Sequence, residues 1–292
     1  MKLFKKCPIC KSNQLVGYAI DCKRGGPHIS RVKCSECHII FANPMADKNE
    51  LMDFYKNYYN QEKYKGINFY QKAEQNIKRI KKNNSEDIFN EVPFLLKLNK
   101  KSKFIDVGCG LGNILAYAEK LDYELYATDY DQKALDFVKS HFKVECFRGD
   151  LVNAKYPDNF FDQVNICHVI EHVLNPIDLL IEIRRILKPG GVLSIGTPNS
   201  ASFLYKFYRI SMFYRFKVPE IIDGLEHTFI FSEKLLAKTC KDLGFSILSH
   251  YTVGLGESLS NLKNSNLSTR KKINRIIQNV FKINQWIICR NN

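Results

Sequence analysis

The stretch Phe104–Asn113, which reads FIDVGCGLGN, contains a strand, a glycine-rich turn and the beginning of a helix. Its first residues are apolar apart from Asp106, as expected for a buried parallel strand. Three glycines follow at alternate positions, where the turn needs unusual backbone angles and a ligand needs bare backbone. Apolar residues then recur at helical spacing from Ile114 onward. We therefore expect an α/β fold that binds a nucleotide-containing ligand at the end of this strand.

Further strand-like segments follow in the order that an alternating βα fold requires. The predicted strands cover Glu124–Thr128, Lys143–Arg148, Phe161–Cys167, Val192–Gly196, Phe245–Val253 and Gln285–Arg290. An amphipathic helix is expected between the strands that end at Cys167 and begin at Val192, with Lys188-Pro189-Gly190-Gly191 ending it. The second strand ends at Asp129, and a carboxylate at such a strand end can accept from both hydroxyls of a ribose.

The glycine turn resembles the first motif of class I S-adenosylmethionine-dependent methyltransferases, in which an acid precedes the first glycine by two residues. The KPGGVL run after the predicted helix, EHVLNP at Glu171–Pro176 and HTFIFS at His227–Ser232 are also typical of that family. Ubiquinone-biosynthesis O-methyltransferases and sugar or polysaccharide-cluster methyltransferases are the most similar branches. The resemblance implies a Rossmann-like seven-stranded sheet whose last strand is antiparallel. It also implies a cofactor site made of Asp106, Gly108, Cys109, Gly110, Gly112, Asp129, Tyr130, Asp150, Leu151 and His168.

Two C-x-x-C pairs near the N-terminus predict a small metal module. Cys7 and Cys10 form the first pair, and Cys34 and Cys37 form the second after an interval of 23 residues. Four thiolates at this spacing are typical of tetrahedral structural zinc in a zinc ribbon. The alternative of disulfide bonds is unusual for a cytoplasmic enzyme, and a thioredoxin-like pair would require a βαβ unit. A closed four-cysteine site stabilises a small fold and takes no direct part in chemistry.

The chain divides into three predicted regions. Residues 1–45 form the zinc-ribbon-like module, 46–95 a helical connector in which Asp47 caps a helix, and 96–292 the methyltransferase domain. An insertion around 200–226 contains seven aromatic residues between positions 203 and 216. Two interpretations stay open for this insertion: a lid over a ring-shaped or lipid-bearing acceptor, or aromatic packing onto the domain.

Methyl transfer asks mainly for an acceptor held in line with an activated methyl group. A hydroxyl acceptor also loses a proton, so a general base assists. His227 is the first candidate by resemblance, and His168 and His172 are the others. In the ubiquinone O-methyltransferases, acids and a histidine at these positions are associated with a divalent metal, and Glu171 and His172 match that pattern. Because His168 stands where an acid would be expected, we favour roles in shaping the site over metal binding.

The net charge of +14 is unevenly distributed. Residues 103–200 carry 10 Lys or Arg and 14 Asp or Glu, so the excess of positive charge lies in the flanking regions. We expect a cytoplasmic enzyme, without a transmembrane segment, that methylates a small molecule or saccharide, most simply at oxygen. The acceptor could be phosphorylated or lipid-linked, with peripheral membrane contact. The alternatives are an rRNA or tRNA methyltransferase, although no N-P-P-Y-like motif is present, and a non-catalytic zinc-dependent scaffold.

Overall fold

The computed structural model describes residues 1–20, 30–55, 68–82, 92–96, 98–202, 227–253 and 284–292. The predicted aromatic insertion at positions 203–216 lies outside these ranges. Within the described ranges, no helix combines the length and apolar character that a membrane span requires.

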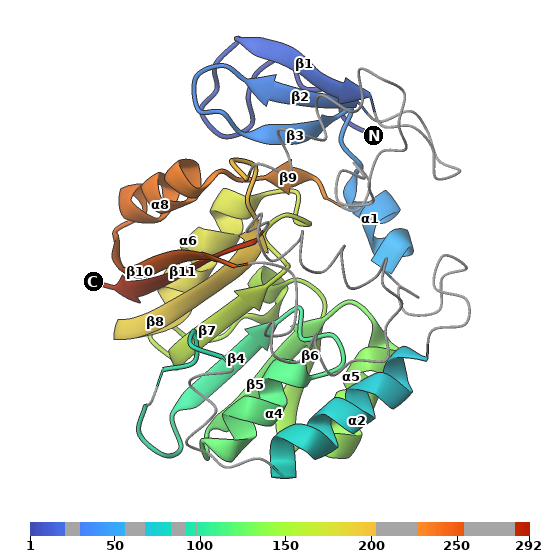
Figure 1. Cartoon of the computed structure of the whole chain (residues 1–292), viewed down its shortest axis with the longest axis vertical. Helices are drawn as coiled ribbons and strands as arrows, with labels where there is room; N and C mark the ends of the chain where they lie inside the picture. Colours follow the sequence, from blue (N-terminus) through green and yellow to red (C-terminus); the bar gives the residue numbers. More distant parts are fainter. Residues whose placement is uncertain (21–29, 56–67, 83–91, 97, 203–226, 254–283) are drawn as a thin grey trace, which may run out of the picture.

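A seven-stranded sheet forms the centre of the molecule (Figure 1). Its strands, in sheet order, are β10 (Phe245–Val253), β11 (Asn284–Asn291), β8 (Leu187–Pro198), β7 (Phe161–Cys167), β4 (Lys103–Val107), β5 (Glu124–Asp129) and β6 (Val144–Arg148). Strands β4 to β8 pair in parallel, whereas β11 runs antiparallel to both β8 and β10. The predicted Rossmann-like methyltransferase sheet with an antiparallel last strand is therefore confirmed.

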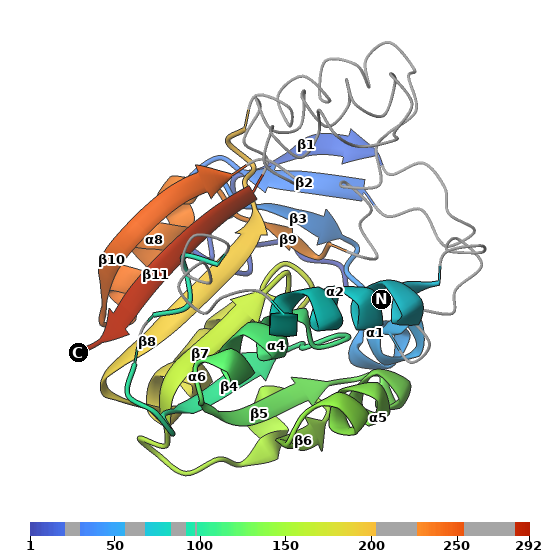
Figure 2. The same ribbon diagram turned by 60° about the horizontal axis from the view of Figure 1, so that its bottom comes forward.

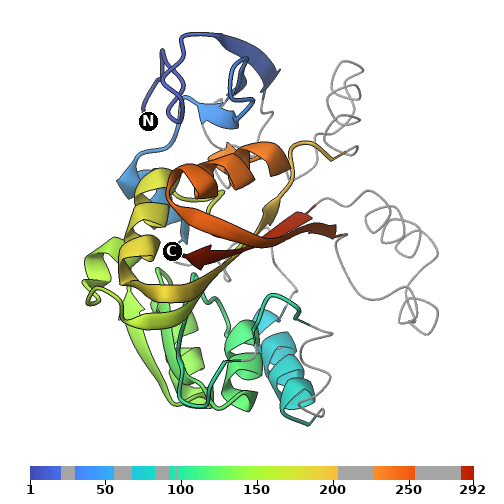
Figure 3. The ribbon, with the colours of Figure 1, turned by 90° about the vertical axis from the view of Figure 1, so that its left-hand side faces the viewer.

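Helices cover both faces of this sheet, because alternate residues of each central strand face opposite sides. In β4, Phe104 belongs to one buried apolar cluster and Ile105 to the other. Figures 2 and 3 show the helices grouped on the two sides. One group comprises α2 (Phe69–Lys82), α4 (Asn113–Lys120) and α5 (Gln132–His141), and the other α6 (Pro176–Ile186) and α8 (Glu233–Asp242). A 3-10 turn at Leu151–Ala154 follows β6.

The boundary between α6 and β8 differs from the sequence prediction. The helix ends at Ile186, and the strand begins at Leu187 rather than Val192. Leu187 already pairs with Phe161, and the ladder resumes at Val192 after a register shift. The KPGG run is therefore an irregularity inside the strand, where Gly190 adopts a φ of 77° that favours glycine.

The N-terminal region forms a second sheet above the first (Figure 1). It consists of β1 (Leu15–Ile20), β2 (Ser30–Cys34), β3 (Ile40–Asn43) and β9 (Phe229–Ile230). Helix α1 (Lys48–Tyr55) follows β3, and Asp47 caps its first turn, as predicted. Strand β9 lies far along the chain, inside the region predicted to be the methyltransferase domain, yet it pairs with β3. A strand from the later part of the chain therefore completes the N-terminal sheet through backbone hydrogen bonds.

Candidate functional site

A cavity of about 570 Å³ lies at the carboxyl ends of β4, β5 and β7. In open parallel sheets, ligands bind at this edge. Most of the predicted cofactor residues line the cavity: Gly108, Gly110, Asp129, Tyr130, Asp150, Leu151 and His168. Asp106, Cys109 and Gly112 are not among its lining residues. The structure therefore gathers strand-end acids, bare glycine backbone and a histidine around one space.

The glycine turn is hydrogen-bonded to the end of β5. The N–H groups of Gly108 and Cys109 donate to the Thr128 carbonyl oxygen at 2.8 and 3.0 Å, and the Gly110 N–H donates to Asp129 Oδ2 at 2.8 Å. Gly108 has a φ of 67°, and a Cβ there would lie 2.6 Å from Val169 Cγ2. Glycine is therefore required at this position by both backbone conformation and space.

Asp106 is buried at the end of β4 and does not line the cavity. Its side chain is 3% exposed, and Oδ1 accepts a hydrogen bond from Asn165 Nδ2 at 2.7 Å. Burial raises the pKa of Asp106 to about 7, and the nearby Asp129 carboxylate adds to the effect. Asp106 is thus covered, whereas Asp129 lines the cavity.

Helix α1 supplies a wall of the cavity that sequence reasoning missed. Lys48, Leu51 and Tyr55 line it, and Lys48 Nζ lies 3.1 Å from Asp150 Oδ2. The hydroxyl of Tyr130 also donates to Asp150. The helix start at Asp47 was recognisable from its cap, but the spacing of apolar residues does not tell which sheet edge the helix meets.

Glu171 is the centre of a buried polar cluster beside the cavity. Its side chain is fully buried, and its two oxygens bond His168 Nδ1 at 3.0 Å and accept from Thr197 Oγ1 at 2.9 Å. Burial by itself would raise the pKa of Glu171, but the hydrogen bond from His168 and the neighbouring His172 outweigh burial and lower it to about 2. The carboxylate is therefore ionised at neutral pH.

His172 connects this cluster to the cavity. It lines the cavity, and its Nδ1 lies 2.8 Å from the Tyr55 hydroxyl oxygen, while its Nε2 lies 3.9 Å from Glu171 Oε1. Its ring stacks on that of His227, with centroids 4.8 Å apart. The Tyr55 phenol is thus hydrogen-bonded to one nitrogen of the imidazole, and the Glu171 carboxylate lies near the other.

His227, the first candidate for the base, lies beside the cavity but does not line it. Its Nδ1 is buried without a hydrogen-bond partner in the part of the chain that the structure describes. Burial, followed by the proximity of His172, lowers the pKa of His227 well below its usual value. A neutral imidazole therefore packs behind His172.

Donor atoms of Glu171, His172 and His227 lie within 4.8 Å of one another. Glu171 already has a hydrogen-bond partner on each oxygen, and the two imidazole rings stack on each other. Hydrogen bonding therefore satisfies both Glu171 oxygens, whereas His227 Nδ1 has no hydrogen-bond partner among the described residues.

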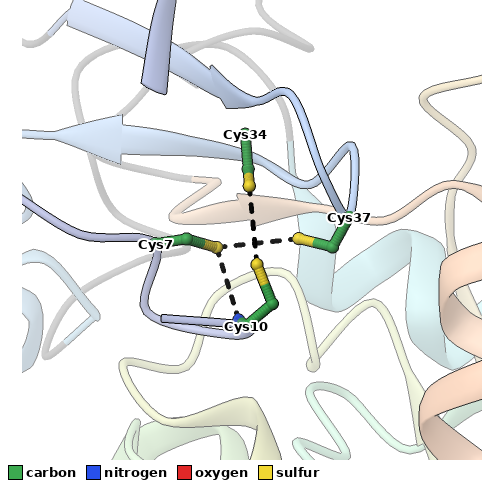
Figure 4. A group of neighbouring side chains, drawn as sticks. All are labelled: Cys7, Cys10, Cys34 and Cys37. Carbon is green, nitrogen blue, oxygen red and sulfur yellow. Dashed lines mark hydrogen bonds between the residues drawn. The ribbon is translucent and has the colours of Figure 1, made fainter. Parts of the chain in front are cut away.

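The four N-terminal cysteines converge on one point (Figure 4). Sγ of Cys7 lies 3.6 Å from that of Cys37, and Sγ of Cys10 lies 3.5 Å from that of Cys34. Sulfur atoms about 2.3 Å from a tetrahedral zinc ion would be about 3.8 Å apart, so these spacings match the ion's size. The hydrogen bond from Cys37 lowers the pKa of the Cys7 thiol to about 5, against the opposing effect of burial. The donor set therefore fits zinc.

Residues 105–195 match the family model described as "Methyltransferase domain". The chain is 33% identical to an uncharacterized methyltransferase of Schizosaccharomyces pombe over 113 residues, which cover 34% of this chain and 41% of that protein. It is 29% identical to a demethylmenaquinone methyltransferase of Bacillus licheniformis over 133 residues, which cover 43% of this chain and 57% of that protein. The chain thus matches about half the length of these relatives.

Solved structures share the fold. One is a chain from the complex between the Haloferax volcanii Trm112 methyltransferase activator and a methyltransferase, with a TM-score of 0.52 and 14% identity over 77% of this chain and 97% of that one. Another is an S-adenosylmethionine-dependent methyltransferase of Archaeoglobus fulgidus, with a TM-score of 0.51 and 20% identity over 77% and 100%.

Proposed function

We propose that this chain, whose residues 105–195 form a class I S-adenosylmethionine-dependent methyltransferase domain, methylates a hydroxyl group of a small molecule or saccharide. The observation that carries the proposal is the single cavity that brings Asp129 and the glycine turn together with His172. Asp129 suits the ribose of the donor, and the glycine turn suits its amino-acid part. His172 suits a hydroxyl acceptor. The likeness to a demethylmenaquinone methyltransferase supports a small-molecule acceptor.

S-Adenosylmethionine supplies an electrophilic methyl group when it is bound, so the protein needs to hold the acceptor oxygen in line and take up its proton. His172 is the best-placed base. The Tyr55 hydroxyl, which lines the cavity, can accept the acceptor's proton and pass its own to His172 Nδ1. The buried carboxylate of Glu171 stabilises the imidazolium that results.

The acceptor is tested by a turnover screen. Purified protein with S-adenosylmethionine is offered quinol precursors, nucleotide sugars, lipid-linked sugars and rRNA, and S-adenosylhomocysteine release is followed. Turnover with a quinol or a sugar supports the proposal. Turnover with rRNA alone, or binding of the donor with no turnover on any of the small molecules, contradicts the proposed acceptor class.

With an acceptor from that screen, His172→Gln is expected to lower kcat by about 100-fold or more, because the proton of the hydroxyl then has no base. S-Adenosylhomocysteine affinity should stay within a few-fold, which calorimetry measures. His250→Gln is the matched control, since His250 lies on β10 and bonds Gln285 outside the cavity. If kcat instead falls about 100-fold in His227→Gln and is unchanged in His172→Gln, the base is His227 and not His172.

We further propose that Cys7, Cys10, Cys34 and Cys37 hold one structural zinc ion. The spacing of their sulfur atoms supports this. Metal analysis should find about one zinc per chain, and Cys10→Ser should lose it together with several kcal/mol of stability, roughly as structural zinc sites contribute. Cys146→Ser is the control, because Cys146 lies on β6 away from the cluster. Full zinc content in Cys10→Ser would exclude this ligand set.

A further inference from the structure

One wall of the cavity comes from a helix outside the region that matches the methyltransferase family model. Lys48 at the first turn of α1 pairs with Asp150, and Tyr55 at its last residue bonds His172. Leu51 between them is 7% exposed and also lines the cavity. Helix α1 therefore touches both Asp150 of the predicted cofactor site and His172, the proposed base.

Helix α1 has only eight residues, and an isolated helix of this length is unstable in water. Asp47 Oδ1 accepts from the N–H groups of Asn49 and Glu50, and Glu50 Oε2 accepts from the Asp47 N–H at 2.8 Å. This capping box satisfies the first turn but does not position the helix. Its position therefore depends on its contacts with the cavity and on the segment to which its N-terminus is attached.

That segment is hydrogen-bonded to the four-cysteine module. The backbones of Lys2 and Met45 exchange two hydrogen bonds of 2.7 and 2.8 Å, and the Asn43 side chain bonds both the N–H and the carbonyl oxygen of Phe4. Residues 2–4 lead directly to Cys7. Met45 is 1% exposed and shares one apolar cluster with Cys7 and Cys34. The segment before α1 is thus built into the metal module.

A second connection joins the module to the loop that carries His172. The Ala42 N–H donates to the Thr228 carbonyl oxygen at 2.9 Å, next to the β3–β9 pairing. The Thr228 hydroxyl lies 2.9 Å from the carbonyl oxygens of both Glu171 and Val173, to which it can donate. Displacement of β3 would therefore act on both sides of the contact between α1 and His172.

We infer that the four-cysteine module is a working part of the methyl-donor site: with zinc bound it holds α1 against the cavity, and without zinc the site loses that wall and binds the donor weakly. The inference rests on the proposed function. A sheet this small buries too little apolar surface to keep its shape without the metal. Lys48, Leu51 and Tyr55 then leave the cavity together.

The test compares zinc-loaded full-length protein with the same protein after chelation, using S-adenosylhomocysteine as the calorimetric probe. Chelation is expected to raise Kd by about tenfold or more. In zinc-loaded protein, Lys48→Met and Leu51→Ala should each weaken binding, whereas in metal-free protein they should have no further effect. Such non-additivity is the sign of coupling through one element. Met52→Ala is the matched control, because Met52 lies on α1 but is 43% exposed and outside the cavity lining.

Unchanged affinity after chelation, or equal effects of Lys48→Met with and without zinc, would overturn the inference while the proposed function stands. Failure of the zinc-loaded protein to bind S-adenosylhomocysteine would instead overturn the proposed function. If circular dichroism shows that chelation unfolds the whole chain, Asn43→Ala decides the question. This variant removes the bonds to Phe4 but no cysteine. With full zinc content its affinity should fall, and an unchanged Kd would refute the coupling.

Discussion

Asp129→Ala is expected to weaken S-adenosylhomocysteine binding by about 100-fold or more. The substitution removes the carboxylate proposed to accept from both ribose hydroxyls, and charge-assisted hydrogen bonds contribute roughly 1.5–3 kcal/mol each. It also releases the Gly110 N–H, which Asp129 Oδ2 holds at 2.8 Å, so the glycine turn loses an anchor. Isothermal titration calorimetry measures the change directly, without knowledge of the acceptor.

Two further variants test whether the loss of affinity comes from the carboxylate of Asp129. Asp129→Asn keeps the shape of the side chain but lacks the second acceptor oxygen, so most of the affinity should still be lost. Asp136→Ala removes an exposed acid of α5 and should bind normally. Affinity close to that of the unmodified protein in Asp129→Ala would mean that the ribose is held elsewhere.

Glu171→Gln is expected to lower the free energy of unfolding by about 3 kcal/mol at pH 7, because it breaks a buried charged cluster and puts an amide N–H against the donors of His168 or Thr197. The single tryptophan, Trp286, stacks on Phe94 with centroids 3.8 Å apart, so its fluorescence follows urea unfolding. Glu145→Gln, at an exposed position of β6, is the control and should be nearly neutral.

The difference in the free energy of unfolding between the unmodified protein and Glu171→Gln should decrease at low pH. The folded-state pKa of Glu171, about 2, lies below its ordinary value of 4.5. The carboxylate therefore stabilises the folded state fully above pH 4.5, and this contribution is lost as pH falls from 4.5 through 2. The stability curves of the two proteins should converge over that interval. Parallel curves would show that the carboxylate does not gain its stabilisation from ionisation.

The sequence predicted the fold because its signals are local and repeated. Hydrophobic runs, glycine turns and the cap at Asp47 each depend on a few neighbouring residues, and all agreed with one order of strands. The start of β8 was predicted too late, since the pairing of Leu187 with Phe161 depends on a strand that lies elsewhere in the chain. No local pattern distinguishes a helix end from an irregularity within a strand.

By itself, the sequence determined the class of domain and the residues at the strand ends, including Asp129 and the cysteine pairs. Only the tertiary structure decided where the histidines lie: His172 contacts Tyr55 at the cavity, whereas His227 packs behind it. The contact of Lys48 with Asp150, across 102 positions of the chain, was likewise invisible in the sequence. The reason is physical. Strand ends are specified by spacing along the chain, while the walls of a site are specified by packing between segments that have no fixed separation.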